Sequence, residues 1–203
     1  MPLHLEAWKE AIESFGRVYD AEFFFSKKGM RDTDIVEQFN RRCGMELHSA
    51  SVVGAKDQLF EQHVDSVKFA RPVVDVVQRH RSVLPMAVVP GGAREIVERE
   101  LEVIGIAALF DVILTADDPF KPKPSPDLSV EAARKIGVLA SLCQVFEDGD
   151  IGLQAARSAG MLATDIRLFL QERLDHTKMA FAKCRDDGAA ERSMASKLSR
   201  GEE

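Results

Sequence analysis

The sequence has few cysteines and no long hydrophobic run, and both absences narrow the kinds of protein that it can encode. Its three cysteines, Cys43, Cys143 and Cys184, are odd in number and far apart, which fits reduced thiols better than a disulfide framework or a zinc knuckle. No apolar run reaches the roughly 18 residues of a membrane span. The first ten residues do not resemble a secretory signal peptide. We therefore expect a globular protein of the cytoplasm.

An excess of positive charge is also absent. The formal net charge is −6 at pH 7, and no basic stripe offsets the acidic residues, so we expect neither nucleic acid nor an anionic membrane as a partner. An anionic substrate would have to be held by a few local groups. The 203 residues, 45% of them hydrophobic, suffice for one domain or for one domain with a small second one.

Apolar residues at helical spacing predict an all-helical segment over residues 1 to about 70. The first helix would bury Leu5, Trp8, Ile12 and Phe15. A second helix is expected to begin with Asp32 or Thr33 as its N-cap and to end at Gly44. A third would start at about Ala55, and Pro72 suits the first turn of a fourth.

After Leu84 the pattern changes to alternating strands and helices, which indicates a mostly parallel sheet with helices on its faces. The expected strands are residues 84–89, 110–115, 143–147 and 162–165, with helices over residues 94–103, 128–136 and 150–159. Gly105, Gly137 and Gly160 would end these helices. Residues 167–183 could extend as a further helix, whereas the last twenty residues are polar and rich in charge.

Three loops follow the carboxyl ends of the expected strands, where open α/β sheets hold ligands. Pro90-Gly91-Gly92-Ala93 precedes a helix, and its amides could receive a phosphate or simply form a turn. The segment from Lys121 to Asp127 places Lys121 and Lys123 on a proline-braced loop, although proline spacing alone would also suit a linker with solvated lysines.

The third loop is an acidic turn that contains Glu147 and Asp148. Asp150 behind it would serve as an N-cap or first-turn acid of the following helix. Carboxylates at such a position suit Mg²⁺, which keeps waters and recruits a phosphate, but a solvated acidic turn is the plainer alternative. A cation site, a lysine and a glycine-rich loop at one sheet edge are together the parts needed for phosphoryl transfer.

The motifs as a set resemble the haloacid dehalogenase superfamily, specifically its β-phosphoglucomutase-like and fructose-1-phosphatase-like members with a helical cap. The resemblance covers about residues 1–167 and is carried by PLHLEAW, GMRDTDI, PMAVVPGGARE, KPSPD and VFEDGDIGLQAARSAGM. It implies a Rossmannoid α/β core of residues 71–169, an N-terminal α-helical cap domain of residues 1–70, and a C-terminal helix and polar tail of residues 170–203.

The resemblance also implies roles for individual residues. Lys123 would neutralise the phosphate and act in catalysis, Gly91 and Gly92 would contribute to phosphate binding, and His4 would lie near the substrate at the cap hinge. The metal ligands would be Glu147 and Asp148, with Mg²⁺ as the cofactor. The expected substrate is a small phosphorylated metabolite such as a sugar phosphate, and the oligomeric state stays open.

The sequence departs from this family at two places. Members of the family carry an Asp-x-Asp-Gly motif at the end of a central strand before the cap, and the first aspartate is the nucleophile. No residue of this sequence matches that motif, so we expect a sheet that lacks this strand between the strands ending at Val89 and Glu147. Pro90 stands where the family has a Ser or Thr that binds the phosphate, and proline offers neither a hydroxyl nor an N–H.

The leading interpretation is an N-terminally truncated form of a Mg²⁺-dependent sugar-phosphate phosphatase or mutase, inactive as given because the nucleophile is missing. The alternative is a non-catalytic module that binds a phosphometabolite or a partner. A metal-free dehalogenase fits less well, because its chemistry has no use for Glu147 and Asp148 as a cation site.

Overall fold

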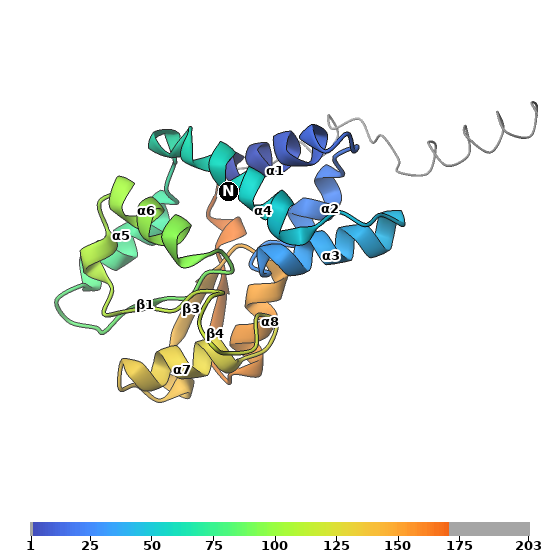
Figure 1. The fold of residues 1–203 in the computed structure, drawn as a ribbon. Coiled ribbons are helices and arrows are strands. Elements are labelled where there is room, and N and C mark those ends of the chain that lie inside the picture. Colours follow the sequence, from blue (N-terminus) through green and yellow to red (C-terminus); the bar gives the residue numbers. More distant parts are fainter. Residues whose placement is uncertain (1, 171–203) are drawn as a thin grey trace, which may run out of the picture.

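The computed structural model describes residues 2–170, and its helices and strands alternate in the order expected for an α/β protein (Figure 1). Tail residues 171–203, which include most of the expected C-terminal helix and Cys184, lie outside the described residues. None of the helices described combines the length and the apolar character needed to cross a lipid bilayer.

The first part of the chain is helical, as predicted. Its α-helices are α1 (Pro2–Ser14), α2 (Ala21–Ser26), α3 (Asp32–Cys43) and α4 (Ser49–Glu61), followed by a 3₁₀ turn at Val64–Ser66. They pack around a cluster rich in aromatic side chains, in which the rings of Trp8 and Phe24 lie 5.0 Å apart and Phe39 is fully buried. We call α1–α4 the helical unit.

Four details of this unit differ from the expectation. Phe15, expected on the buried face of the first helix, lies beyond the end of α1 and is exposed. Helix α2 was not predicted; Asp20 caps it by accepting a hydrogen bond from the Phe23 amide at 2.9 Å. Helix α4 begins six residues before Ala55, at Ser49. Asp32 does not cap α3 but lies in its first turn, and Arg31 occupies the N-cap position without a side-chain cap. The prediction of Gly44 as the end of α3 is confirmed, with φ of 63°.

The second part contains the strands β1 (Ala87–Val88), β2 (Val112–Ile113), β3 (Gln144–Glu147) and β4 (Leu162–Asp165), and the helices α5 (Arg71–His80), α6 (Arg94–Val103), α7 (Asp127–Lys135) and α8 (Asp150–Ser158). The 3₁₀ turns are Ala107–Leu109, Ala140–Leu142 and Ile166–Leu168. The predicted bounds of α6 and β4 agree with the structure. Gly105, Gly137 and Gly160 follow the helix ends with positive φ of 72°, which confirms them as helix stops.

All strand pairing is parallel, but it forms two separate ladders within residues 2–170. Strand β1 pairs only with β2, through Ala87 opposite Val112 and Val88 opposite Ile113, whereas β3 pairs only with β4. The expected sheet without its central strand is therefore what the structure shows. Strands β1 and β2 are both shorter than predicted, since only two residues of each are paired. At the start of the predicted β1, the Leu84 amide still bonds to the His80 carbonyl at 2.9 Å, in the turn that follows α5.

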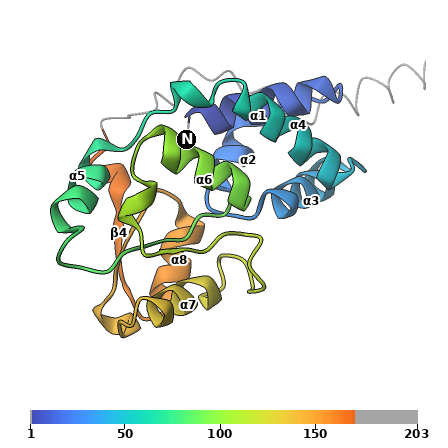
Figure 2. The same ribbon diagram turned by 60° about the vertical axis from the view of Figure 1, so that its left-hand side comes forward.

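The helical unit lies at one end of the molecule and α7 at the opposite end, with the strands between them (Figures 1 and 2). Helix α7 packs on β1 and β2, and α8 packs on β3 and β4. A hydrophobic cluster around Leu114, Leu128 and Ala132 fixes α7 against the first ladder. The loop between α2 and α3, residues 27–31, belongs to the helical unit, and we call it the α2–α3 loop. Its backbone packs against Gly91, which follows β1, and against Gly149, which follows β3.

Candidate functional site

Lys123 is the best-buried member of the predicted site. Its side chain is 4% exposed, and its Nζ donates a hydrogen bond to Glu147 Oε1 in an ion pair that spans 24 residues of sequence. Lys121, two residues away, is exposed. The structure thus brings the loop after β2 to the end of β3, and of the two lysines on that loop it places Lys123 at the acidic turn.

The acidic turn is held between β3 and α8. Glu147 is the last residue of β3 and lies opposite Asp165 in the ladder, and Asp148 follows before α8 begins at Asp150. Asp150 is a first-turn acid of α8, with Gly149 at the N-cap. Gly152 leaves the space that the Glu147 carboxylate occupies, since a Cβ at that position would overlap it. A glycine in the first turn of α8 is therefore part of how this carboxylate is positioned.

The donor set at this turn fits a hard divalent cation. Two adjacent residues supply carboxylate oxygens, one of them set in the space that Gly152 leaves. Among residues 2–170 there is no group of three or more His, Cys, Asp or Glu side chains that could hold a metal by itself. Mg²⁺ commonly takes one or two carboxylates and completes its shell with water and phosphate. Glu147 and Asp148 would be the two protein ligands.

The Asp148 carboxylate also holds a lysine from the helical unit. Lys28 Nζ lies 3.1 Å from Asp148 Oδ2, and the two side chains are 9% and 23% exposed. Each of the two predicted metal ligands is thus paired with a lysine, Glu147 with Lys123 and Asp148 with Lys28. Sequence reasoning missed Lys28, because the pair joins residues 120 positions apart.

The glycine loop after β1 offers free amide donors. Neither the Gly91 nor the Gly92 amide finds an acceptor within residues 2–170. The Gly92 carbonyl accepts from the Ala116 amide at 3.2 Å, and the Arg94 amide donates to Asp117 Oδ2 at 2.7 Å. The first amide of α6 is therefore already used, whereas the Gly91 and Gly92 amides, like that of Ala93, could be offered to a phosphate.

The backbone of the α2–α3 loop packs directly against two glycines, Gly91 of the glycine loop and Gly149 of the acidic turn. A Cβ at Gly91 would lie 2.5 Å from the Gly29 carbonyl oxygen, and a Cβ at Gly149 would lie 2.7 Å from the Lys28 carbonyl oxygen. A Cβ at Gly29 would in turn lie 4.0 Å from Lys123 Cδ. The residues predicted at three separate loops therefore share the α2–α3 loop as a neighbour.

A pocket of about 110 Å³ lies between the helical unit and the glycine loop. Its lining includes His4, Lys28, Lys56, Gly91 and Gly92. His4 Nε2 is 2.9 Å from Glu100 Oε1, and its ring stacks on Phe60. The pocket is smaller than the roughly 300 Å³ that small-molecule sites usually offer. The predicted His4 thus lines the same pocket as the two glycines, and its role stays a prediction.

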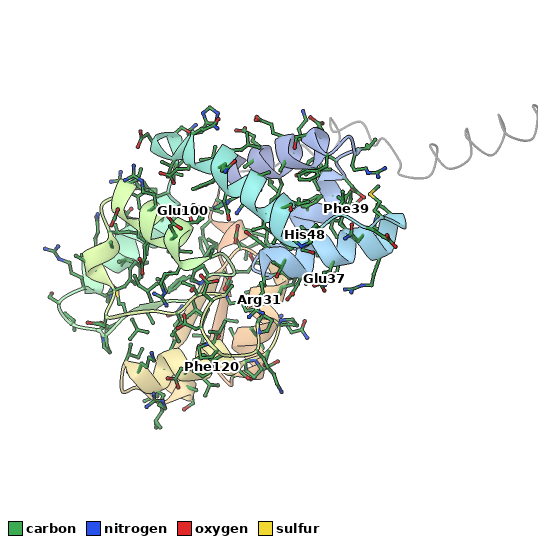
Figure 3. The ribbon with its side chains drawn as sticks, viewed as in Figure 1. Arg31, Glu37, Phe39, His48, Glu100 and Phe120 are labelled. Atoms are coloured by element: carbon green, nitrogen blue, oxygen red, sulfur yellow. The ribbon has the colours of Figure 1, made fainter. Side chains whose placement is uncertain are left out.

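Two further cationic residues at this junction were not predicted. Arg31, labelled in Figure 3, lies where the helical unit meets the second part of the chain. It donates from Nη2 to the Ala116 carbonyl at 3.0 Å, and its buried Nε has no partner within the described residues. Lys56 on α4 is 2% exposed and donates 2.8 Å hydrogen bonds to Asp32 and Asp57. The available signal for Arg31 was its place in GMRDTDI, one of the segments that carry the resemblance, whereas Lys56 lies in none of those segments.

Comparison with known sequences shows the family of the chain. The family model described as haloacid dehalogenase-like hydrolase matches residues 1–165. The fructose-1-phosphate phosphatase YqaB of Escherichia coli is 34% identical over 168 residues, which cover 82% of this chain and 89% of that protein. A phosphorylated carbohydrates phosphatase of Thermotoga maritima is 26% identical over 157 residues, 75% of this chain and 72% of its own.

Comparison with solved structures gives the same fold. A hydrolase from Pseudomonas syringae superposes with a TM-score of 0.73 at 22% identity, covering 80% of this chain and 76% of its own. A β-phosphoglucomutase from Clostridium difficile superposes with a TM-score of 0.69 at 20% identity, covering 87% of this chain and 89% of its own.

Proposed function

Since the chain belongs to the haloacid dehalogenase-like hydrolases, we propose that its site serves Mg²⁺-dependent phosphoryl transfer on a small sugar phosphate, as in a phosphatase or a phosphomutase. One observation carries the proposal. The buried Lys123 pairs with Glu147, and the α2–α3 loop lies against both Lys123 and Gly91. The Gly91 and Gly92 amides have no acceptor within residues 2–170. A phosphate is the ligand that such a cation and such amides would hold together. The fructose-1-phosphate phosphatase and the carbohydrate phosphatase among the relatives support a sugar phosphate.

The residues of this chain would act on the phosphate in distinct ways. Lys123 would balance phosphoryl charge from a position already fixed by burial and by Glu147. The Gly91 and Gly92 amides would orient the phosphoryl oxygens, and His4 would contact the sugar side of the pocket. A metal held by Glu147 and Asp148 would supply further charge neutralisation on those oxygens. We further propose that residues 1–70 act as a cap domain over a core of residues 71–169.

A second candidate, a phosphometabolite-binding module without turnover, is favoured by one feature of the site. Glu147 and Asp148 are each paired with a lysine, and no third acidic side chain joins them in a metal-type cluster within residues 2–170. No described residue matches the Asp-x-Asp-Gly motif, so we assign the nucleophile to none of them. Pro90 also lines the pocket without offering a hydrogen-bond donor.

One experiment on the 203-residue chain separates these readings. Fructose 1-phosphate is added with and without Mg²⁺, its binding is measured by calorimetry, and release of inorganic phosphate is followed over time. We expect the 203-residue chain to be inactive, because no described residue is assigned as the nucleophile, so phosphate release would contradict that expectation and favour the phosphatase. Such release should depend on Mg²⁺, and Lys123→Ala should lower it by at least about 100-fold, the scale of one lost electrostatic group. Lys121→Ala, on the same loop, should leave the rate unchanged.

Binding that depends on Lys123 without any phosphate release would agree with the expected inactivity and would favour the binding module for the chain as given. Mg²⁺-independent release, or release that Lys123→Ala leaves intact, would overturn the proposed site. Absence of both binding and release for fructose 1-phosphate, glucose 1-phosphate and glucose 6-phosphate would overturn the assignment to small sugar phosphates.

A further inference from the structure

The ion pair between Lys28 and Asp148 places a positive charge of the chain itself where a divalent cation would bind. The nitrogen-to-oxygen distance is 3.1 Å, and Lys28 is 9% exposed at its side chain, so water screens the pair only in part. The same ammonium lies 4.0 Å from the centre of the Phe25 ring. Lys28 is therefore held at Asp148 by its surroundings as well as by charge.

The backbone that carries Lys28 is seated on the sheet edge at two glycines. Gly149 leaves the space against which the Lys28 carbonyl rests, and Gly91 does so for the Gly29 carbonyl. Arg31 ties the end of the same loop to the Ala116 carbonyl. The position of the Lys28 ammonium and the docking of the α2–α3 loop are consequently parts of one arrangement.

A divalent cation on Asp148 would disturb this arrangement. It would stand a few ångströms from the Lys28 ammonium, and like charges at such a distance repel strongly where water is largely excluded. Lys123 faces the same problem at Glu147, but it belongs to the α/β part and would gain a phosphate as its new partner. Lys28 belongs to the helical unit, so its release would loosen the contact between the two parts.

We propose that Lys28 is a built-in competitor of the divalent cation at Asp148, so that metal binding releases the α2–α3 loop and loss of the metal lets the loop dock. The inference rests on the proposed function, because it takes Glu147 and Asp148 as the metal ligands. Linkage makes the effect reciprocal: the docked loop weakens metal binding by the same factor by which the metal weakens docking.

The test measures Mg²⁺ binding to the 203-residue chain by titration calorimetry. Lys28→Met keeps the apolar stem of the side chain and removes the ammonium. We expect it to bind Mg²⁺ about 10-fold more tightly than the unmodified chain, the size of one charge-assisted hydrogen bond. Lys27→Met is the matched control, since Lys27 lies one residue away over the Phe23 ring, and we expect its affinity within about 2-fold of the original.

Hydrogen exchange of amides 27–31 gives a second readout that does not depend on affinity. Mg²⁺ should speed this exchange in the unmodified chain and in Lys27→Met, whereas in Lys28→Met exchange should be fast from the start and insensitive to Mg²⁺. Slower exchange on adding Mg²⁺ to the unmodified chain would mean that the metal docks the loop, which would overturn the proposal. Lys28→Gln repeats both readouts should Lys28→Met unfold.

The outcomes separate the competitor from the metal site itself. Equal Mg²⁺ affinity in all three proteins, lost in Asp148→Asn, would refute the role of Lys28 and keep the metal site. Binding that appears only in Lys28→Met would support the competitor role at its strongest. No Mg²⁺ binding in any of them would overturn both the metal site and the inference built on it.

Discussion

At the scale of single residues, the α1–α4 helical unit depends on a buried charge. Lys56 Nζ donates to Asp32 and Asp57 and lies 5.7 Å from the centre of the Trp8 ring. Burial acts to lower the pKa of Lys56, but the carboxylates of Asp32 and Asp57 outweigh it and raise this pKa above its usual value. The ammonium therefore stays charged inside the protein because two carboxylates compensate it.

We predict that Lys56→Met destabilises the protein by about 2 to 4 kcal/mol at pH 7, because it leaves two partly buried carboxylates without their cation. Because folding raises the pKa, this contribution should be constant from pH 7 to about 10 and should shrink as the pH rises through the folded pKa above about 10.4. Urea unfolding between pH 7 and 11 measures it. Lys68→Met, at an exposed lysine, should change stability by less than about 0.5 kcal/mol.

The same residues show why local sequence patterns located some groups and missed others. Asp32 has the sequence context of an N-cap, yet its carboxylate bonds to Lys56, 24 residues away, and leaves the cap position to Arg31. Lys28 and Asp148 are 120 residues apart, so no local spacing could join them. Residues at the carboxyl end of a strand, such as Glu147, were identifiable because strand ends define the site in this class of sheet.

At the scale of elements, the predicted bounds agree with the structure where the local sequence pattern is strong. The bounds of α6 were predicted correctly because its apolar positions keep a helical period up to Gly105, which has φ of 72°. Strand β1 was predicted too long. Only Ala87 and Val88 pair with β2, and the Leu84 amide bonds to the His80 carbonyl of the preceding turn. Helix α2 was missed because Phe23, Phe24 and Phe25 form a run without periodicity, although Asp20 was a readable cap.

Helix α8 gives a prediction about how an element shapes the site. Gly152→Ala would ordinarily favour a helix, but here the new Cβ would overlap the Glu147 carboxylate. We expect a loss of about 1 to 3 kcal/mol in unfolding free energy, together with weaker Mg²⁺ binding. The matched control is Gly54→Ala in α4, which has nothing within 4 Å and should be neutral or stabilising by up to about 1 kcal/mol.

Urea unfolding of both variants, with Mg²⁺ titrations alongside, decides the point. If Gly152→Ala is as stable as Gly54→Ala and binds Mg²⁺ normally, the Glu147 carboxylate does not occupy the space that Gly152 leaves in α8, and the described position of this carboxylate is wrong.

At the scale of the whole molecule, two ladders and a helical unit meet at a single loop. The first ladder, β1 with β2, bears the glycine loop, and the second, β3 with β4, bears the acidic turn. No ladder hydrogen bonds join the two within residues 2–170. The α2–α3 loop touches Gly91 on one side and Gly149 on the other, and Lys123 crosses to Glu147, so these contacts connect the halves of the site.

Docking of the helical unit should therefore respond to substitution of Gly91 in the glycine loop and not to substitution of its neighbour Gly92. A Cβ at Gly91 would meet the Gly29 and Met30 carbonyl oxygens at 2.5 Å and 2.6 Å, while a Cβ at Gly92 would meet only Val97 Cγ2 at an ordinary 3.6 Å. Because the opposing atoms are backbone, Gly91→Ala can be accommodated only if the α2–α3 loop moves away. We expect faster amide hydrogen exchange over residues 27–31 in Gly91→Ala and unchanged exchange in Gly92→Ala. Identical exchange in the two variants would show that the α2–α3 loop does not pack against Gly91. The description of one site shared by the glycine loop, the Lys123 loop and the acidic turn would then be wrong.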